Sequence, residues 1–342
     1  MLPRSLKAAL VAAVLTLVSP ALAHATVVYV KGINKPAVYV ANDDGSGVRR
    51  LATGDNPRIS PDGQTVVYVT GIAQGKATLR AQPAAGGPVR TLLRNWSFGA
   101  FDWSADGRWI VTMSGPLNGK QKLVLIDMTT GTSRTVARGF FSGASFSPAS
   151  DQFVYAKIHS DRQIFSKSNL YTAPVAGGPS HGLTHNGHAL APVWGPTDIA
   201  YSHWARPTGR HRHEDGPKYN IWLIKPDGSN DRALTHDRVP FLLAGLSPVE
   251  WSADGSKLLT QFGGQDTAYA VTVDPATGRE RVVGRKSQSI VGTRLSKDGS
   301  TILAFTGGAG EDPRLENVIT VPYGGGPQVR LAKGAAFPDW NR

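Results

Sequence analysis

Histidine is the residue type in this chain whose distribution points most directly to chemistry. Eight of the nine histidines lie between residues 159 and 236 of a 342-residue chain. Neutral imidazoles bind Zn, Mn, Cu or Ni, and an imidazole also acts as a general base on a sugar or peptide substrate. No set of them has metal-ligand spacing on one strand, so three interpretations stay open: a structural role, contact with a ligand or metal, and catalysis.

Other catalytic signatures are absent or are explained by local structure. The segment Gly178-Pro179-Ser180-His181-Gly182 has the spacing of a serine-hydrolase elbow, which requires a strained strand-to-helix turn. Two Gly-Gly-Pro segments, at 86–88 and 325–327, occupy the same place in an internal repeat. Residues 178–182 are therefore predicted to form a hairpin turn. The chain contains no P-loop and no His-Glu-x-x-His motif.

The same internal repeat predicts the strands and loops that position the histidines. Its anchor is a large apolar residue, Ser, a variable residue and Asp-Gly, which closes a tight turn because glycine takes φ > 0 without steric cost. Clear copies are at 59–63, 103–107, 251–255 and 295–299, and weaker copies are at 146–148, 194–196 and 337–341. The anchor serine or its substitute recurs every 43 to 57 residues. A period of this size is typical of a β-propeller.

Between successive anchors the same order of short apolar runs and glycine-containing turns recurs, without a helical period. The second strand of each repeat is expected at 37–41, 77–81, 123–127, 169–173, 220–224, 268–273 and 317–321. Seven such sets predict an all-β fold, a seven-bladed β-propeller of four-stranded antiparallel blades.

The two ends of the chain are predicted to complete one blade. The last anchor, at 337–341, has no strand after it, whereas residues 26–32 closely match residues 65–71, which follow the first anchor. The carboxyl-terminal strand is therefore predicted to be the innermost strand of a blade whose other strands come from 26–51. This pairing closes the ring and leaves no exposed inner edge. Trp340 is expected beside residues 27–30.

These repeats resemble the TolB-like (WD-repeat-like) β-propellers. The family repeat reads aromatic-Ser-Pro-Asp-Gly, a strand, a Gly turn and then Arg-x-Leu-Thr, and its closest matches here are at 103–107, 251–255, 183–184 and 234–235. The resemblance covers nearly the whole chain after residue 25. It implies a propeller fold, although TolB itself carries an amino-terminal α/β domain that has no counterpart before the first strand expected here. Such blades occur in periplasmic binding proteins, peptidase gates and carbohydrate-active enzymes.

The repeat places most histidines on one face of the propeller, where the loops at 184–191, 203–218 and 236–249 emerge. The residues predicted to contact a ligand there are His185, His188, His203, Trp204, His211, His213 and His236. Trp204, with Phe241 and Leu242 on the same loops, either forms part of a recognition surface or caps the blade core. The anchor tryptophans Trp103, Trp194, Trp251 and Trp340 are predicted to pack between blades.

The amino terminus has the pattern of an export signal. Arg4 and Lys7 precede an apolar segment at 8–18, and small residues then offer cleavage sites before residue 26. Residues 1–25 are thus predicted to be a cleaved signal peptide, and 26–342 a single propeller domain located in the periplasm or secreted. Eleven apolar residues are too few to span a bilayer of about 30 Å, so no transmembrane anchor is expected.

Composition limits the partners. The chain has no cysteine and a formal net charge of +12, and no run of Lys and Arg concentrates that charge. In an exported protein the excess favours anionic envelope polymers or lipid head groups over nucleic acid, and a basic solvated surface without a specific partner is the alternative. The expected partner of the module is an envelope protein or an anionic envelope polymer. We expect a monomeric binding module that is not an enzyme and needs no cofactor. The alternative is a metal-assisted carbohydrate-active enzyme, similar to a lyase, that uses the histidine-rich face to hold a divalent metal.

Overall fold

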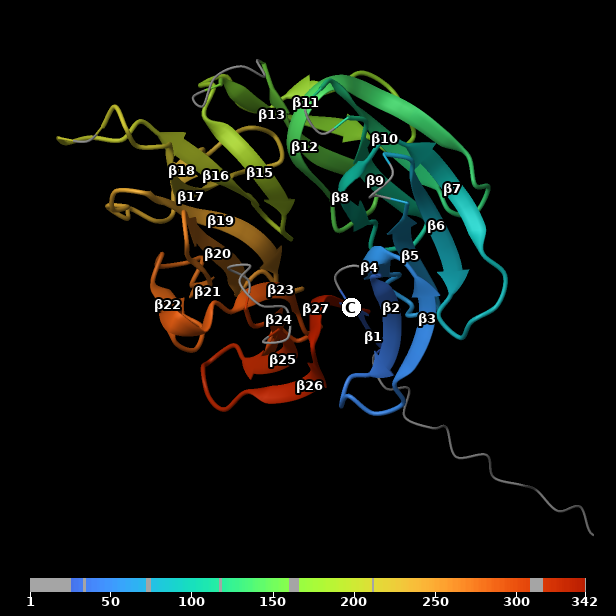
Figure 1. The fold of residues 1–342 in the computed structure, drawn as a ribbon. Coiled ribbons are helices and arrows are strands. Elements are labelled where there is room, and N and C mark those ends of the chain that lie inside the picture. Colours follow the sequence, from blue (N-terminus) through green and yellow to red (C-terminus); the bar gives the residue numbers. More distant parts are fainter. Residues whose placement is uncertain are drawn as a thin grey trace, which may run out of the picture.

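The computed structural model describes residues 26–32, 35–71, 75–116, 119–159, 166–210, 212–307 and 316–341. The predicted signal peptide and His211 lie outside this part of the chain. The described residues form β-strands throughout, apart from one 3-10 turn at Lys286–Gln288. In Figure 1 the sheets follow one another around a ring, from β1 in blue to β27 in red beside it.

Three of the five sheets have four strands, each strand hydrogen-bonded to the next. The first sheet contains β27 (Ala335–Trp340), β1 (Thr26–Lys31), β2 (Ala37–Asn42) and β3 (Arg49–Thr53). The second contains β4 (Asp55–Ile59), β5 (Thr65–Thr70), β6 (Ala77–Pro83) and β7 (Arg90–Asn95). The third contains β23 (Val291–Leu295), β24 (Thr301–Phe305), β25 (Asn317–Pro322) and β26 (Val329–Lys333).

The other two sheets have seven and eight strands. The seven-stranded sheet contains β8 (Phe98–Trp103), β9 (Trp109–Ser114), β10 (Gln121–Asp127), β11 (Ser133–Phe146), β12 (Gln152–Ile158), β13 (Ser168–Pro174) and β14 (His181–Gly182). The eight-stranded sheet contains β15 (Ala189–Trp194), β16 (Ile199–Ala205), β17 (Lys218–Ile224), β18 (Arg232–Ala233), β19 (Leu243–Trp251), β20 (Leu258–Gly264), β21 (Ala268–Val273) and β22 (Glu280–Val282).

In each of the two long sheets the regular strand pairing is interrupted near the middle. The fourteen-residue strand β11 pairs with β10 through its first half and with β12 through its second half. In the eight-stranded sheet, β17 and β19 are joined by one parallel pair, Tyr219 and Gly245. The second strands β2, β6, β10, β13, β17, β21 and β25 lie where the repeat predicts them.

The ring closes as the sequence predicts. Strand β27 pairs antiparallel with β1, with Trp340 opposite Val27 and Ala336 opposite Val30. The side-chain amide oxygen of Asn341 also accepts a hydrogen bond from the Thr26 nitrogen at 2.6 Å. The last strand of the chain therefore holds the first, so that the inner edge of this sheet is covered.

Apolar side chains fill the spaces between neighbouring sheets. In β5, Val66 belongs to a buried cluster shared with β1 and β2, and the next residue, Val67, belongs to a cluster shared with β8, β9 and β10. Successive side chains of a strand point to opposite faces, so both faces of each sheet are buried. Seven such clusters occur in the described part of the chain, and each combines residues of two successive repeats.

The anchor turns are built by one serine and one aspartate. In the copy at 252–257, Ser252 Oγ donates to Asp254 Oδ1 at 2.6 Å and accepts from the Lys257 nitrogen at 3.0 Å. The glycine that follows, Gly255, has φ of 73°. Hydrogen bonds from Ser252, Ser256 and backbone nitrogens lower the pKa of Asp254 to about 2. These aspartates are therefore turn formers, as their position in hairpins predicts.

The Leu-Thr motif fastens the outer strand of a blade. Thr235 Oγ1 accepts from the Ile221 nitrogen at 3.0 Å and donates to Asn220 Oδ1 at 2.9 Å. Thr184 accepts from the Leu170 nitrogen at 2.9 Å in the same way. Segment 178–182 consists of the end of the connection after β13 and the short antiparallel strand β14 itself, so the serine motif lies in a hairpin as expected.

Candidate functional site

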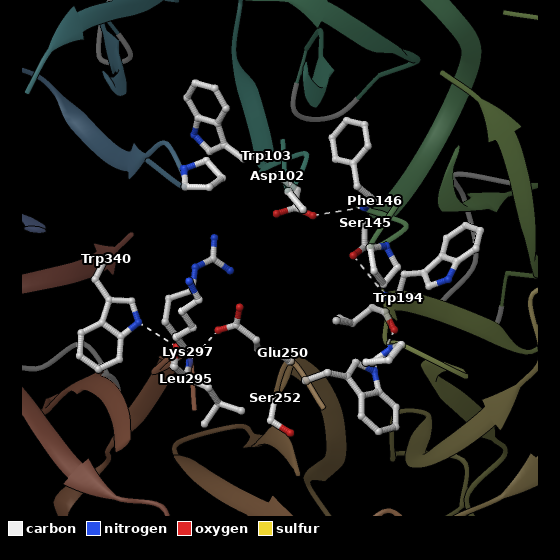
Figure 2. Close-up of a pocket in the computed structure, with 18 of the residues that line it drawn as sticks. Asp102, Trp103, Ser145, Phe146, Trp194, Glu250, Ser252, Leu295, Lys297 and Trp340 are labelled. Carbon is white, nitrogen blue, oxygen red and sulfur yellow. Dashed lines mark hydrogen bonds between the residues drawn. The ribbon is translucent and has the colours of Figure 1, made fainter. Parts of the chain in front are cut away.

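A cavity of about 350 Å³ is surrounded by residues of all seven repeats. Its lining comes from the ends of β4, β8, β11, β15, β19, β23 and β27, and from the anchor turns that follow them. Figure 2 shows these side chains converging from every side on one space. The cavity therefore lies on the axis of the propeller, at the end where the anchor turns are.

Four indole rings form much of its wall. Trp103, Trp194, Trp251 and Trp340 each precede an anchor serine or its substitute, and all four line the cavity. Trp103 and Trp340 are 7 % exposed and also belong to the clusters between sheets. The sequence predicts packing for these residues, and the structure adds a second role: each packs against its neighbours and presents part of its ring to the cavity.

The three indole nitrogens with described environments differ in their partners. Trp340 Nε1 donates to the Leu295 carbonyl at 2.9 Å, and Trp251 Nε1 donates to the Val193 carbonyl at 3.2 Å. Trp103 Nε1 is buried and has no hydrogen-bond partner among the described residues. An unsatisfied buried donor costs about 1–3 kcal/mol. In Figure 2 the five-membered ring of Trp103 is the part nearer the middle of the cavity.

The position two residues before each anchor serine supplies polar groups to the cavity. Asp102, Ser145, Glu250 and Asp339 occupy it in four repeats, and each accepts the backbone N–H of the residue before the anchor in the next repeat. The shortest of these bonds joins Leu295 N to Glu250 Oε2 at 2.7 Å. These bonds fix the inner strands relative to one another around the axis.

Two arginines complete this inner set. Arg294 Nε donates to Asp339 Oδ1 at 2.5 Å, and these side chains are 13 % and 1 % exposed. Burial alone would lower the pKa of Arg294, but Asp339, Glu250 and Asp102 raise it above its ordinary value. Arg58 has a lowered pKa because of burial and the nearby Arg294 charge, partly offset by Asp339. Its guanidinium donates to the Pro57 carbonyl at 3.4 Å.

The sequence contained a signal for this site. Apart from Asp55 and Asn56 in β4, the ends of the inner strands are otherwise mainly apolar or small. The position two residues before the anchor is nevertheless Arg58, Asp102, Ser145, Val193, Glu250, Arg294 and Asp339 in the seven repeats. Five of these seven are charged. A charged side chain in a strand that must be surrounded by other strands is costly unless it is paired, so its recurrence at one position indicates a shared polar centre.

The histidine-rich loops lie at the opposite end of the propeller. In the pair β15 and β16, Trp194 is opposite Ile199 at the cavity end, and Ala189 is opposite His203 at the other end. None of the predicted ligand-binding residues lines the cavity. His185, His213 and His236 are exposed on three different connections.

The structure brings three of the predicted residues together. The rings of Trp204, His188, His203 and Trp222 form one stack, with centroids 4.2, 5.2 and 4.1 Å apart. Trp204 is 4 % exposed, and its Nε1 donates to the Gly187 carbonyl at 3.1 Å. Trp204 thus caps the blade. Burial and the neighbouring His188 lower the pKa of His203 to about 4, so His203 is neutral near pH 7.

No metal site is apparent in the described part of the chain. Within it, no group of three or more His, Asp or Glu side chains is arranged to hold a metal ion. Ligand binding by the predicted histidines, with His211 outside the described residues, stays a prediction.

A second, smaller cavity of about 250 Å³ lies beside the connection that follows β18. Asp237 and Glu280 both line it, next to the stacked rings of Phe262 and Tyr269, whose centroids are 4.7 Å apart. Burial, and then the Asp237 carboxylate, raise the pKa of Glu280 to about 7. Two carboxylates sharing a site in this way disfavour the doubly ionised state.

Solved structures with a similar fold are β-propellers. The chain is similar to the propeller domain of the Trilobed protease from Pyrococcus furiosus, with a TM-score of 0.66 and 14 % identity, over 90 % of this chain and 92 % of that chain. It is similar to TolB from Acinetobacter baumannii (TM-score 0.56, 14 % identity, 92 % and 82 % covered). It is also similar to an oligogalacturonate lyase in complex with manganese (TM-score 0.60, 17 % identity, 91 % and 85 % covered).

At these identities the likeness shows the fold alone, a TolB-like β-propeller. No protein-family model matches the sequence. No curated protein matches it either.

Proposed function

We propose that this chain is an exported, TolB-like β-propeller that acts as a binding module and takes a segment of a partner protein into its central cavity. The observation that carries the proposal is the cavity itself, a space of about 350 Å³ with four indoles in its wall and charged side chains at the ends of the inner strands. Pockets of this size with apolar walls and few polar groups are typical of ligand sites.

Seven four-stranded blades are the arrangement that supports this interpretation best. Dividing the seven-stranded sheet within β11, and the eight-stranded sheet between β17 and β19, makes seven units. The seven interlayer clusters then each lie between two adjacent units, including the unit closed by β27 and β1. A closed ring is rigid, so the cavity wall is preorganised for binding.

The lining favours an extended segment with an aromatic or proline side chain. Indole faces and the proline rings of Pro61, Pro148 and Pro196 offer flat apolar contacts. Asp102 is half-buried, and only one of its carboxylate oxygens accepts the Phe146 nitrogen, at 3.3 Å. A donor on the segment would pair with the other oxygen.

The proposed setting follows from the amino terminus and from the charge of the chain. Residues 1–25 are proposed to direct export and to be removed, leaving one domain, 26–342, that works as a monomer in the periplasm or outside the cell. No helix in the described residues is long and apolar enough to cross a membrane. The proposed partner is an envelope protein.

Blocking the cavity mouth tests the proposal without disturbing the core. Ala105 and Ala253 are exposed turn residues at the cavity lining. Replacing both by Trp fills the entrance, whereas the exposed Ala276 lies on a turn that does not line it. From an envelope extract, the wild type and A276W are expected to capture the same partner, and A105W/A253W to lose it. Equal capture by all three proteins would refute binding in the cavity.

The enzyme alternative, a lyase-like use of the histidine-rich loops, gains no support from side-chain geometry in the described residues. Metal analysis of the purified protein and of its H185A/H188A/H203A variant is the direct test. A stoichiometric metal that the triple variant loses would establish the alternative.

A further inference from the structure

The two ends of the propeller differ sharply in charge. We call the end with the anchor turns the cavity end, and the opposite end, with the histidine-rich connections, the loop end. Cavity-end connections with their flanking strand residues are 42–50, 60–64, 83–90, 104–108, 127–134, 147–151, 174–181, 195–198, 224–232, 252–257, 274–281, 296–300 and 322–330. They carry 12 Lys and Arg and 13 Asp and Glu.

Loop-end connections are strongly basic. In the described residues they are 31–32, 35–36, 53–55, 71, 75–77, 94–98, 114–116, 119–122, 138–141, 157–159, 166–168, 183–188, 205–210, 212–218, 236–243, 264–267, 284–290, 306–307, 316–317 and 333–334. They carry 17 Lys and Arg and six Asp and Glu. Nearly all of the net positive charge of the propeller is therefore at one end. The acidic turn formers of the anchor motif neutralise the other end.

The loop end also exposes large apolar side chains. Phe241 is 43 % and Leu242 is 47 % exposed at the tip of the connection between β18 and β19. Trp96, between β7 and β8, is 66 % exposed. In Figure 1, β7 and β19 lie on opposite sides of the ring, so these side chains are well separated contact points at the same end.

The tip at Phe241 and Leu242 is held in place by a nearly buried ion pair. Lys218 Nζ lies 2.6 Å from Asp215 Oδ2, with side chains 11 % and 7 % exposed. Lys218 Nζ also donates to the carbonyls of Pro240 and Leu243 at 2.8 and 2.7 Å, and Asp215 Oδ1 accepts the Leu242 nitrogen at 3.2 Å. Leu242 has φ of 63°, a strained conformation for a leucine. The network holds the tip, with its two exposed apolar side chains, against Asp215 and Lys218.

We propose that the loop end binds an anionic lipid surface, with Phe241, Leu242 and Trp96 entering the interfacial region of the bilayer. The basic excess matches the negative potential of such a surface. Exposed aromatic and leucine side chains gain free energy from the acyl boundary, which a soluble polyanion does not offer. Binding in this orientation leaves the cavity end open to solvent. The inference uses the opposite end of the molecule and stands independently of the cavity proposal.

Vesicle co-sedimentation of the purified protein tests the electrostatic part. Vesicles of 30 % phosphatidylglycerol in phosphatidylcholine are expected to bind the protein in a salt-dependent way, and pure phosphatidylcholine vesicles to bind it weakly. Each cationic residue near such a surface raises the partition coefficient about fivefold, so R210Q/R212Q is expected to lower that coefficient roughly 25-fold. The control R279Q/R330Q removes two exposed arginines from the cavity end and should leave binding unchanged. Equal loss in both variants, or no preference for anionic vesicles, would overturn the proposal.

A second pair of variants separates a lipid surface from a soluble polyanion. F241S/L242S is expected to weaken binding to anionic vesicles about tenfold and to leave binding to soluble polyphosphate unchanged. V89S/V329S is the control, because Val89 and Val329 are 45 % and 56 % exposed at the cavity end. If F241S/L242S has no effect on vesicle binding, and polyphosphate binds the protein as tightly as vesicles do, the lipid proposal is wrong. Unchanged thermal unfolding shows that each variant is folded.

Discussion

Removing the carboxylate of Asp339 tests the polar centre on the propeller axis. This side chain is 1 % exposed and joins three parts of the ring: it lies on β27, accepts Arg294 Nε at 2.5 Å, and accepts the Ile59 nitrogen at 2.8 Å. D339A leaves the Arg294 guanidinium buried without its partner. Breaking one side of a buried pair costs about 3–5 kcal/mol. For about 317 residues this corresponds to a fall in melting temperature of roughly 5–8 °C.

The controls are a double-mutant cycle and a surface pair of the same chemistry. R294M should cost about as much as D339A, and R294M/D339A should cost clearly less than the sum, because neither charge is then left alone. Arg108 and Asp127 form an ion pair at 3.1 Å, but Arg108 is 54 % exposed, so R108M should cost at most about 1 kcal/mol. Calorimetry measures all four variants. Additive losses in the cycle, or a loss from D339A no larger than that from R108M, would refute the reasoning.

Three further perturbations test individual contacts. W340F leaves the Leu295 carbonyl without its donor at 2.9 Å, whereas W103F removes a donor that has no partner among the described residues. Chemical denaturation should therefore show W340F to be less stable than W103F by about 1 kcal/mol. Equal stability would contradict these hydrogen-bond assignments. T235V removes the hydroxyl that accepts the Ile221 nitrogen and donates to Asn220, and it should cost about 1–3 kcal/mol in the same assay. The pKa of His203 is about 4 in the folded protein and 6.5 in the unfolded chain, so the unfolded state binds more protons between these pH values. The free energy of unfolding therefore falls as the pH drops from 6.5 to 4. H203F should flatten this part of the profile of stability against pH, and an unchanged profile would disprove the role of His203.

The repeat in the sequence was sufficient to predict the architecture. Anchor spacing located the second strands, and the match between 26–32 and 65–71 predicted that Trp340 lies beside residues 27–30; in the structure it lies opposite Val27. These predictions hold because a propeller repeats one local solution, in which Ser252, Asp254 and Gly255 make a turn whatever the rest of the ring does. Local hydrogen bonds of this kind are encoded over five or six residues.

The candidate site was harder to predict because it belongs to no single repeat. Asp102, Glu250, Arg294 and Asp339 are far apart in the sequence, and each reads as an isolated polar residue in an inner strand. Their meeting follows from ring closure, which brings the same position of every repeat to the axis. The histidines are clustered in the sequence, yet His185, His213 and His236 are exposed on separate connections. Among the described residues, His188, His203 and Trp204 are the predicted ones that meet, in the ring stack.

Site-specific photo-crosslinking in cells tests the central claim most directly. A photoreactive phenylalanine at position 105 lies at the mouth of the cavity, and the same group at position 276 lies on a turn outside it. If a partner segment occupies the cavity, position 105 should give one discrete crosslinked protein that disappears when A253W narrows the entrance, and position 276 should give none. No crosslink from position 105, or the same product from position 276, would contradict the account.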